Sequence, residues 1–254
     1  MMKHAGARAA FFLLISLLAP AARADVYLLG ETVGATGASP LHPGWQGTMS
    51  LGYLATRGNS NTTSYNAKAA GTYLDGRWQH MLLGQWLGAS DTGMTTASSH
   101  ELNAQSDYAL NDSHYLFGYL DDLGDSFSGY QRRLTELAGY GYKAVDTQSQ
   151  QLSLEAGAGA RQTRFVDGSR RSAPVERLAL NYLWKLSVTS SFSELLSLEH
   201  GVDDTYIQSA TALTANLFGS FALSVSFTVK HNTRPLMGFK PTDASTAVSL
   251  VYSF

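Results

Sequence analysis

Residues 221–230 read Phe-Ala-Leu-Ser-Val-Ser-Phe-Thr-Val-Lys, with a large apolar side chain at every odd position and a small or polar one at every even position. Side chains of a β-strand point alternately to opposite faces, so this stretch predicts a strand with one apolar and one polar face. The same alternation recurs in residues 101–110, 151–161 and 175–188, where Leu183 interrupts the polar row. The chain therefore predicts an all-β fold.

The first 24 residues have the pattern of a secretory signal peptide. Two basic residues precede an apolar stretch, and Ala22-Arg23-Ala24 is a small-x-small cleavage site. The alternative, an N-terminal membrane anchor, fits less well because the apolar stretch is short and contains Pro20. Residues 25–44 are rich in Gly and include two Pro, which predicts a flexible leader rather than a plug domain.

The composition excludes several classes of site. The 254 residues contain no Cys, which excludes disulfides, Cys nucleophiles and Cys-ligated zinc or iron–sulfur sites. Without residues 1–24 the chain carries 15 Lys and Arg against 20 Asp and Glu, a net charge of −5, and no basic patch indicates nucleic-acid binding. After the signal peptide no apolar run is long enough to cross a bilayer as a helix.

Breaks in the alternation predict about twelve strands in one domain, residues 45–254. Five short turns alternate with six mostly longer connections, which is typical of an antiparallel, up-and-down transmembrane β-barrel of the bacterial outer membrane. Both termini would then lie on the short-turn, periplasmic side, and residues 25–44 would be a periplasmic leader. A soluble sandwich or lipocalin-like barrel shares the alternation but requires no difference between its ends. The short turns are expected at 75–76, 111–113, 145–148, 189–191 and 218–220, and the longer connections near 58–61, 90–97, 124–130, 164–174, 203–205 and 232–242.

Aromatic residues flank nearly every short turn. Such rings are favoured at the level of lipid headgroups, so they predict a girdle at one membrane interface. The last strand alternates and ends on an aromatic residue, which resembles the assembly signal read by the outer-membrane insertion machinery. The signal residues are Val248, Leu250, Tyr252 and Phe254, and the girdle residues are Tyr73, Trp78, Tyr108, Tyr115, Tyr142, Trp184, Phe192, Phe218 and Phe221.

Two stretches fit the alternation poorly. Glu136 shares its face with Leu134 and two tyrosines, and Glu194 shares its face with Phe192 and Leu196. Carboxylates are costly on a lipid-facing surface except near the interface. We therefore expect a register slip or a rim position within residues 131–144 and within residues 192–200.

Several Gly-rich motifs resemble an uncharacterised family named for salt-induced outer-membrane proteins. The resemblance spans about residues 45–254, and it implies an outer-membrane β-barrel without implying a reaction or catalytic residues. The motifs that carry it are Trp45-x-Gly47, Gly52, Gly58-Asn59-Ser60, Asp125-x-Phe127, Gly139-x-Gly141-Tyr142 and Leu152-x-Leu154-Glu155-Ala156-Gly157-Ala158-Gly159-Ala160-Arg161.

No catalytic or metal-binding constellation is evident, so we expect neither enzymatic activity nor a cofactor. Ser98-Ser99-His100 offers a nucleophile and a base but lies at a predicted loop-to-strand boundary without a third partner. The carboxylates of Asp121, Asp122 and Asp125, and those of Asp203 and Asp204, could bind a divalent cation on the outer surface. Solvated loop charges are the simpler interpretation, because carboxylates in a loop are no evidence of a formed oxygen cage.

Twelve strands about 4.8 Å apart and tilted by about 40° would close at a backbone radius of roughly 12 Å, which leaves room in the lumen. The charges predicted to line it are of both signs, so they could border a narrow, weakly selective channel or pair into a closed filling. The first alternative predicts passage of small solutes or ions. The second predicts a structural or envelope-stress barrel that binds lipopolysaccharide or a partner protein. Besides outer-membrane lipids and lipopolysaccharide, the expected partner is the assembly machinery. The predicted lumen residues are Lys68, Asp107, Glu155, Arg161, Arg177, Lys185, Glu199 and Lys230.

Overall fold

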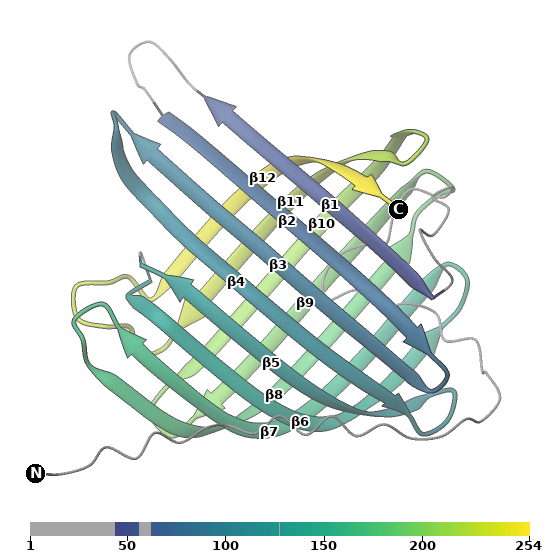
Figure 1. Cartoon of the computed structure of the whole chain (residues 1–254), viewed down its shortest axis with the longest axis horizontal. Coiled ribbons are helices and arrows are strands. Elements are labelled where there is room, and N and C mark those ends of the chain that lie inside the picture. The colour runs from purple at the N-terminus through teal and green to yellow at the C-terminus, as the bar shows by residue number, and fades with distance from the viewer. Residues whose placement is uncertain (1–43, 56–61, 127) are drawn as a thin grey trace, which may run out of the picture.

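The computed structural model describes residues 44–55, 62–126 and 128–254, which form one closed antiparallel barrel (Figure 1). Each strand pairs with its neighbours in sequence, and β1 closes the barrel by pairing with β12. The predicted all-β, up-and-down barrel of twelve strands is thereby confirmed. The strands are β1 (Trp45–Ala55), β2 (Thr62–Asp75), β3 (Trp78–Asp91), β4 (Met94–Ala109), β5 (His114–Asp125), β6 (Tyr130–Asp146), β7 (Gln150–Phe165), β8 (Arg170–Lys185), β9 (Ser190–Gly201), β10 (Thr205–Phe218), β11 (Phe221–Asn232) and β12 (Thr242–Ser253).

Two of the predicted segments fall outside this description. The expected signal peptide and all of the expected leader except Gly44 precede the described residues. Within the described part of the chain, no helix is long and apolar enough to cross a membrane.

The alternation in the sequence separates the two faces of the barrel wall. The outer face carries large apolar side chains that are exposed, such as Leu51 (68%), Trp86 (58%) and Leu178 (59%). Polar and charged side chains of the inner face are buried in the lumen, among them Thr135, Glu155 and Arg177. The hydrophobic surface therefore faces outward and the polar surface inward, the reverse of a water-soluble barrel.

The two ends of the barrel differ less than the sequence suggests. The five short turns lie close to their predicted positions, but most of the connections at the other end are also short. Residues 90–97, for example, were expected to form a loop, yet β3 and β4 continue through them to a two-residue turn. Thr92 (φ 48°) and Gly93 (φ 83°) both adopt the left-handed region, as a tight hairpin turn requires. Among the connections within the described residues, only the one between β11 and β12, residues 233–241, is long.

The barrel closes through a short seam between its first and last strands. β1 and β12 are in register from Thr48 opposite Ser253 to Leu51 opposite Leu250. Beyond that register, Gly47 and Phe254 exchange two backbone hydrogen bonds, N to O at 2.9 and 3.0 Å. The Phe254 ring covers Gly47, since a Cβ placed on this glycine would lie 2.6 Å from it. The predicted assembly signal thus forms the last rung of the closure.

Aromatic side chains ring the outer face at the short-turn end. Ring centroids lie 4.8 Å apart for Trp45 and Tyr73, and 5.0 Å apart for Trp78 and Tyr108. Tyr115 was predicted to belong to this girdle, and that assignment is wrong. His114 takes the outward position at the start of β5, so Tyr115 points inward and is buried. The ring continues through Tyr142, Trp184, Phe192, Phe218, Phe221, Tyr252 and Phe254.

Residues 131–144 and 192–200 fit the alternation poorly, but the strand register does not shift at Glu136 or at Glu194. The register of β9 is continuous with both neighbouring strands, and Glu194 remains on the outer face. Its two oxygens accept hydrogen bonds from the hydroxyls of Ser209 (2.7 Å) and Thr211, which satisfy the carboxylate without a slip. β6 does contain register shifts near both of its ends, but Glu136 stays outward and exposed between them. The slip expected within residues 131–144 is therefore present, near Arg132 and Ala144 and not at Glu136, whereas the slip expected within residues 192–200 is not.

Candidate functional site in the lumen

Two cavities that share no lining residue lie in the lumen formed by the described residues. The smaller one, of about 30 Å³, lies at the short-turn end and is lined by Arg77, Asp107 and Lys143 among others. The larger one, of about 400 Å³, reaches from the middle of the barrel to the end opposite the five short turns, which we call the loop end. We call the larger cavity the chamber. Both cavities have charged walls, so the site to be explained is the layer of side chains between them.

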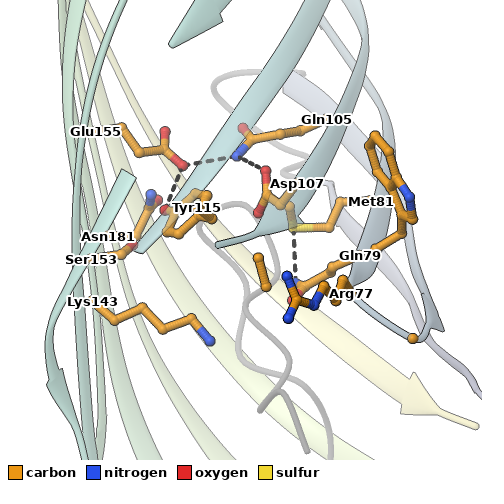
Figure 2. A pocket seen from close by; sticks show the side chains of 13 residues that line it. Arg77, Gln79, Met81, Gln105, Asp107, Tyr115, Lys143, Ser153, Glu155 and Asn181 are labelled. Carbon is orange, nitrogen blue, oxygen red and sulfur yellow. Dashed lines mark hydrogen bonds between the residues drawn. The ribbon is translucent and has the colours of Figure 1, made fainter. Parts of the chain in front are cut away.

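Glu155, on β7, is the centre of that layer (Figure 2). Its Oε1 accepts hydrogen bonds from Gln105 Nε2 at 2.8 Å and from the Tyr115 hydroxyl at 3.0 Å, and its Oε2 accepts from Arg177 Nη1 at 2.8 Å. Gln105 Nε2 also donates to Asp107 Oδ1 at 3.0 Å. Because Gln105 belongs to β4, the contact with β7 crosses the lumen instead of following the sheet. We call Gln105, Glu155 and Arg177 the barrier.

Glycines on the inner face of β6 and β7 make room for this arrangement. The Tyr115 ring covers Gly141, and the Phe117 ring covers Gly139 and Gly157; a Cβ on Gly157 would lie 2.9 Å from Phe117 Cζ. A larger residue at these positions would push the rings of Tyr115 and Phe117 away from the inner face of β6 and β7. The Gly-rich motifs of the sequence thus have a local structural role, which is to place Tyr115 against Glu155.

Further ion pairs line the half of the lumen between the barrier and the loop end. Arg177 Nε lies 4.0 Å from Glu199 Oε1, and Arg161 forms an ion pair with the same carboxylate. Lys230 Nζ, on β11, lies 3.6 Å from Glu101 Oε2 on β4, so this pair also joins strands that are not neighbours. Buried charges need such partners, because an unpaired ion in a low-dielectric interior is strongly unfavourable.

Part of the loop-side mouth is covered by an apolar cluster. Leu123, Tyr130 and Phe165 are buried together, and Leu236 from the long β11–β12 connection packs against them. The Asn232 amide donates to the Tyr130 hydroxyl, which fastens β11 to β6 across the mouth. This end of the lumen is therefore closed over β5 to β7. The chamber extends along the opposite side of the lumen, next to β10 to β12.

The predicted lumen residues occupy several different places. Lys68, Arg177, Glu199 and Lys230 line the chamber, and Asp107 and Glu155 line the smaller cavity. Arg161 is buried beside Glu199 and lines neither cavity. Lys185 has inward parity but lies at the end of β8, where it is exposed and lines neither cavity.

The sequence analysis missed several inward groups. Glu101, Gln105 and Asn103 stand in the same polar row as Asp107, and only Asp107 was singled out. Arg133 was also overlooked, although it occupies the same odd-numbered, inward-facing positions of β6 as Thr135, Leu137 and Gly139. It is 3% exposed, and its guanidinium carbon lies 3.8 Å from the centroid of the Tyr206 ring.

The acidic clusters proposed from the sequence do not form. Alternation along β5 sends Asp121 into the lumen, where it is buried, and Asp122 to the outer face, where Arg132 binds it. Asp125 accepts hydrogen bonds from Ser128. Thus the interpretation of Asp121 as a solvated loop charge was wrong, because β5 extends through it.

The remaining candidates also separate. Asp203 faces Arg171 and Arg234, whereas Asp204 faces Arg161. Ser98, Ser99 and His100 lie inside β4 rather than at its edge. Over residues 44–55, 62–126 and 128–254, no group of three or more His, Asp or Glu side chains is arranged to hold a metal ion.

A model of the family described as "Protein of unknown function, DUF481" matches residues 49–254. The chain belongs to this family. It is 28% identical over 210 residues to the uncharacterized protein YdiY of Escherichia coli (strain K12), a match that covers 82% of this chain and 83% of YdiY. The description of the DUF481 family states no function, so the salt induction implied by the sequence resemblance stays a prediction.

Solved structures with a similar fold are barrels. The NanC porin has a TM-score of 0.50 with 9% sequence identity, and the match covers 82% of this chain and 98% of that porin. The translocator domain of the autotransporter NalP from Neisseria meningitidis has a TM-score of 0.46 with 13% identity, and the match covers 84% of this chain and 90% of that domain. At 9% identity the likeness to NanC establishes the fold of this DUF481 protein and not its activity.

Proposed function

We propose that this DUF481 protein is a non-enzymatic barrel of the bacterial outer membrane, with its short turns and both termini in the periplasm. The support is the reversed polarity of the wall, which places apolar side chains outside and charges inside. A closed barrel satisfies every backbone group between strands, so such a wall is compatible with a bilayer. The aromatic ring at the short-turn end fits one headgroup interface.

Within that membrane, the lumen serves as a narrow, weakly selective channel for small solutes or ions. One observation carries this proposal: two cavities with charged side chains in their walls lie on either side of a single layer of side chains, the barrier. Charges of both signs border the route, from Lys143 and Asp107 below to Lys68 and Glu101 above. Balanced charge favours weak selectivity, and the barrier favours a low conductance.

Conductance of the purified protein in planar bilayers tests the channel. The paired variant Glu155→Ala/Arg177→Ala removes the ion pair of the barrier and leaves only Gln105 of its three side chains, so conductance should rise above that of the unaltered protein. Asp203→Ala/Arg234→Ala is a matched control, because it removes an exposed acid–base pair outside the lumen (3.8 Å) and should leave conductance unchanged. Equal conductance of the barrier variant and the control would contradict the assignment of the barrier.

A second candidate function, a closed structural barrel, is favoured by the buried ion pairs of the lumen, one of which, Lys230 with Glu101, crosses it. If the pairs serve stability alone, the protein conducts no current above background, and the barrier variant loses thermal stability without gaining conductance. A channel predicts measurable current from the unaltered protein. Bilayer recordings and melting curves of the same three samples therefore separate the two functions.

Single cysteines test the orientation, since the chain has none of its own. Lys240→Cys lies in the exposed long connection, and Asp112→Cys lies in an exposed short turn at the opposite end. On intact cells an impermeant thiol reagent should label the first variant and not the second. The reverse pattern would invert the orientation while leaving the barrel and its membrane location in place.

A further inference from the structure

Three arginines form a row across adjacent strands on the outer face. Arg132 of β6 lies directly opposite Arg164 of β7, and Arg164 lies directly opposite Arg170 of β8. All three side chains are exposed, and each lies within two residues of the loop end of its strand. Adjacent strands are about 4.8 Å apart, so the row spans about 10 Å. We call it the arginine row.

The residues that the structure describes do not fully neutralise the row. Asp122 accepts hydrogen bonds from Arg132 Nε at 2.9 Å and from Nη2 at 2.6 Å, which accounts for one of the three charges. Arg164 and Arg170 form no ion pair with any of the residues that the structure describes. Like charges directly opposite each other in a sheet repel, so the arrangement is unfavourable unless an anion lies against it.

The nearest other carboxylate in sequence belongs to the turn between Arg164 and Arg170. Asp167 accepts hydrogen bonds from the backbone N and the hydroxyl of Ser169, at 2.8 and 2.6 Å. These bonds hold the pKa of the Asp167 carboxyl below its usual value, so the group is ionised, but its bonds go to the turn and not to the arginines. An excess of positive charge therefore remains at the loop end of the outer face of β7 and β8, although Glu176 lies farther along β8 on the same face.

The outer face becomes apolar on the short-turn side of this row. Along β7, the outward positions that follow Arg164 toward the short-turn end are Gln162, Ala160, Ala158 and Ala156. The exposed carboxylates of Glu136 and Glu176 lie beside Ala160 and Ala158 on the adjacent strands, and large apolar side chains begin beside Ala156. The positive charges thus lie at the loop end, beyond the apolar surface that a bilayer would cover. At that level a membrane presents the headgroups of its lipids, and the guanidinium group matches the geometry of phosphate oxygens.

We propose that the arginine row binds the phosphate groups of lipid headgroups in the leaflet that surrounds the loop end. The proposal rests on the membrane location proposed above and adds to it a partner and a binding surface. Arg164 and Arg170 supply two charges with no ion-pair partner among the described residues, and Arg132 with Asp122 fixes one edge of the surface. A bisphosphorylated lipid could contact neighbouring arginines at once, because the row holds them about one strand spacing apart.

Binding of bisphosphorylated lipid A to the full protein in phosphatidylcholine nanodiscs tests the proposal. Each arginine near an anionic lipid contributes on the order of 1 kcal/mol, so Arg164→Gln/Arg170→Gln should weaken the affinity by about 30-fold. The matched control is Arg234→Gln/Lys240→Gln, which removes the same charge from the exposed connection at the same end and should bind as the unaltered protein does. Lipid A without phosphates should bind the unaltered protein and the Arg164→Gln/Arg170→Gln variant equally.

Three results would overturn the proposal. They are equal affinity of the row variant and the control, equal affinity for lipid A with and without phosphates, and full displacement of lipid A by inorganic phosphate at the same phosphate concentration. The last result would assign the row to a free anion. Failure of the proposed membrane location looks different, because the unaltered protein would then not enter the nanodiscs at all.

Discussion

Two parts of the inner wall, which β3 separates on one side, are built from different side chains. The inner faces of β4 to β9, which we call the charged wall, present long polar and charged groups such as Gln105, Glu155 and Arg177. The inner faces of β10 to β12 with β1 and β2, the small-residue wall, present mainly Ser, Thr and Ala, for example Ser226 and Ala247. The chamber lies between the two walls, and both contacts that cross the lumen from β4, Gln105 with Glu155 and Glu101 with Lys230, begin on the charged wall.

The small-residue wall determines how much space is open in the lumen, and the charged wall determines how the charged side chains pair. Short side chains cannot reach the opposite wall, so the small-residue wall leaves the chamber open beside it. Long charged side chains can reach one another, so the charged wall organises itself into ion pairs with fixed partners. Changes in the charged wall should therefore act mainly on stability, and changes in the small-residue wall mainly on the space available for passage.

The largest effect is expected at the seam that closes the small-residue wall. Deletion of Phe254 removes two backbone hydrogen bonds and the ring over Gly47, so most of the protein should fail to reach the membrane as a closed barrel. The assay is the heat-modifiable band of membrane fractions on detergent gels. Phe254→Tyr keeps both the bonds and the ring and should restore the band. Normal insertion of the truncated chain would show that the last rung is dispensable.

Breaking one ion pair of the charged wall should cost the next largest amount. Arg177→Met leaves Glu155 buried without its cationic partner and should lower the free energy of unfolding by about 3–5 kcal/mol. Glu155→Leu/Arg177→Met removes both charges and should regain much of that loss, because the uncompensated ion is gone. Unfolding in detergent micelles measures both variants. A double variant as unstable as the single one would indicate that packing rather than charge is decisive at this site.

A matched pair of valines compares the packing of the two walls. Gly141→Val on β6 collides with the Tyr115 ring and should destabilise the barrel by about 1–3 kcal/mol. Ala247→Val on β12 extends into the chamber and should change stability by less than about 0.5 kcal/mol. Melting temperatures of the two variants check the contrast. Equal losses would mean that the small-residue wall is as tightly packed as the charged wall.

The smallest expected effect concerns ion selectivity. Asp107→Asn/Glu155→Gln replaces both carboxyl groups in the walls of the smaller cavity and so lowers the negative charge there, and the reversal potential in a salt gradient should shift toward that of an anion. Adding Ser226→Asp places one negative charge on the opposite wall of the chamber and should partly reverse the shift. An unchanged reversal potential in both variants would place the conducting route away from these groups.

Most of the fold was predictable because it depends on period and order along the chain. The alternation in residues 221–230 defines one strand and two faces, and repeats of it define the strand number. The lengths of the loops were not predictable in the same way. Whether residues 90–97 form a loop or two strand ends depends on Thr92 and Gly93 both taking positive φ, and of the two only Gly93 suggests such a conformation from sequence.

The candidate site was less predictable because its contacts join strands that are distant in sequence. The alternation in the sequence places Asp107, Glu155 and Arg177 on the inner face, and the same alternation could have identified Glu101 and Arg133. The partner of each charge could not be read, since the distance from Gln105 to Glu155 depends on the shape of the closed barrel. Lys185 illustrates the converse, because parity alone does not tell a lumen position from an exposed strand end.

The topology also determines the order in which the barrel can form. Every strand pairing except one joins neighbours in sequence, whereas the pairing of β1 with β12 joins residues such as Thr48 and Ser253. Hairpins close small loops at little entropic cost, but the seam must bring together the two ends of the whole sheet. We therefore expect the seam to be the rate-limiting event of folding. A seam substitution such as Gly47→Val should slow the final closing phase and leave the earlier hairpin phases unchanged in stopped-flow experiments.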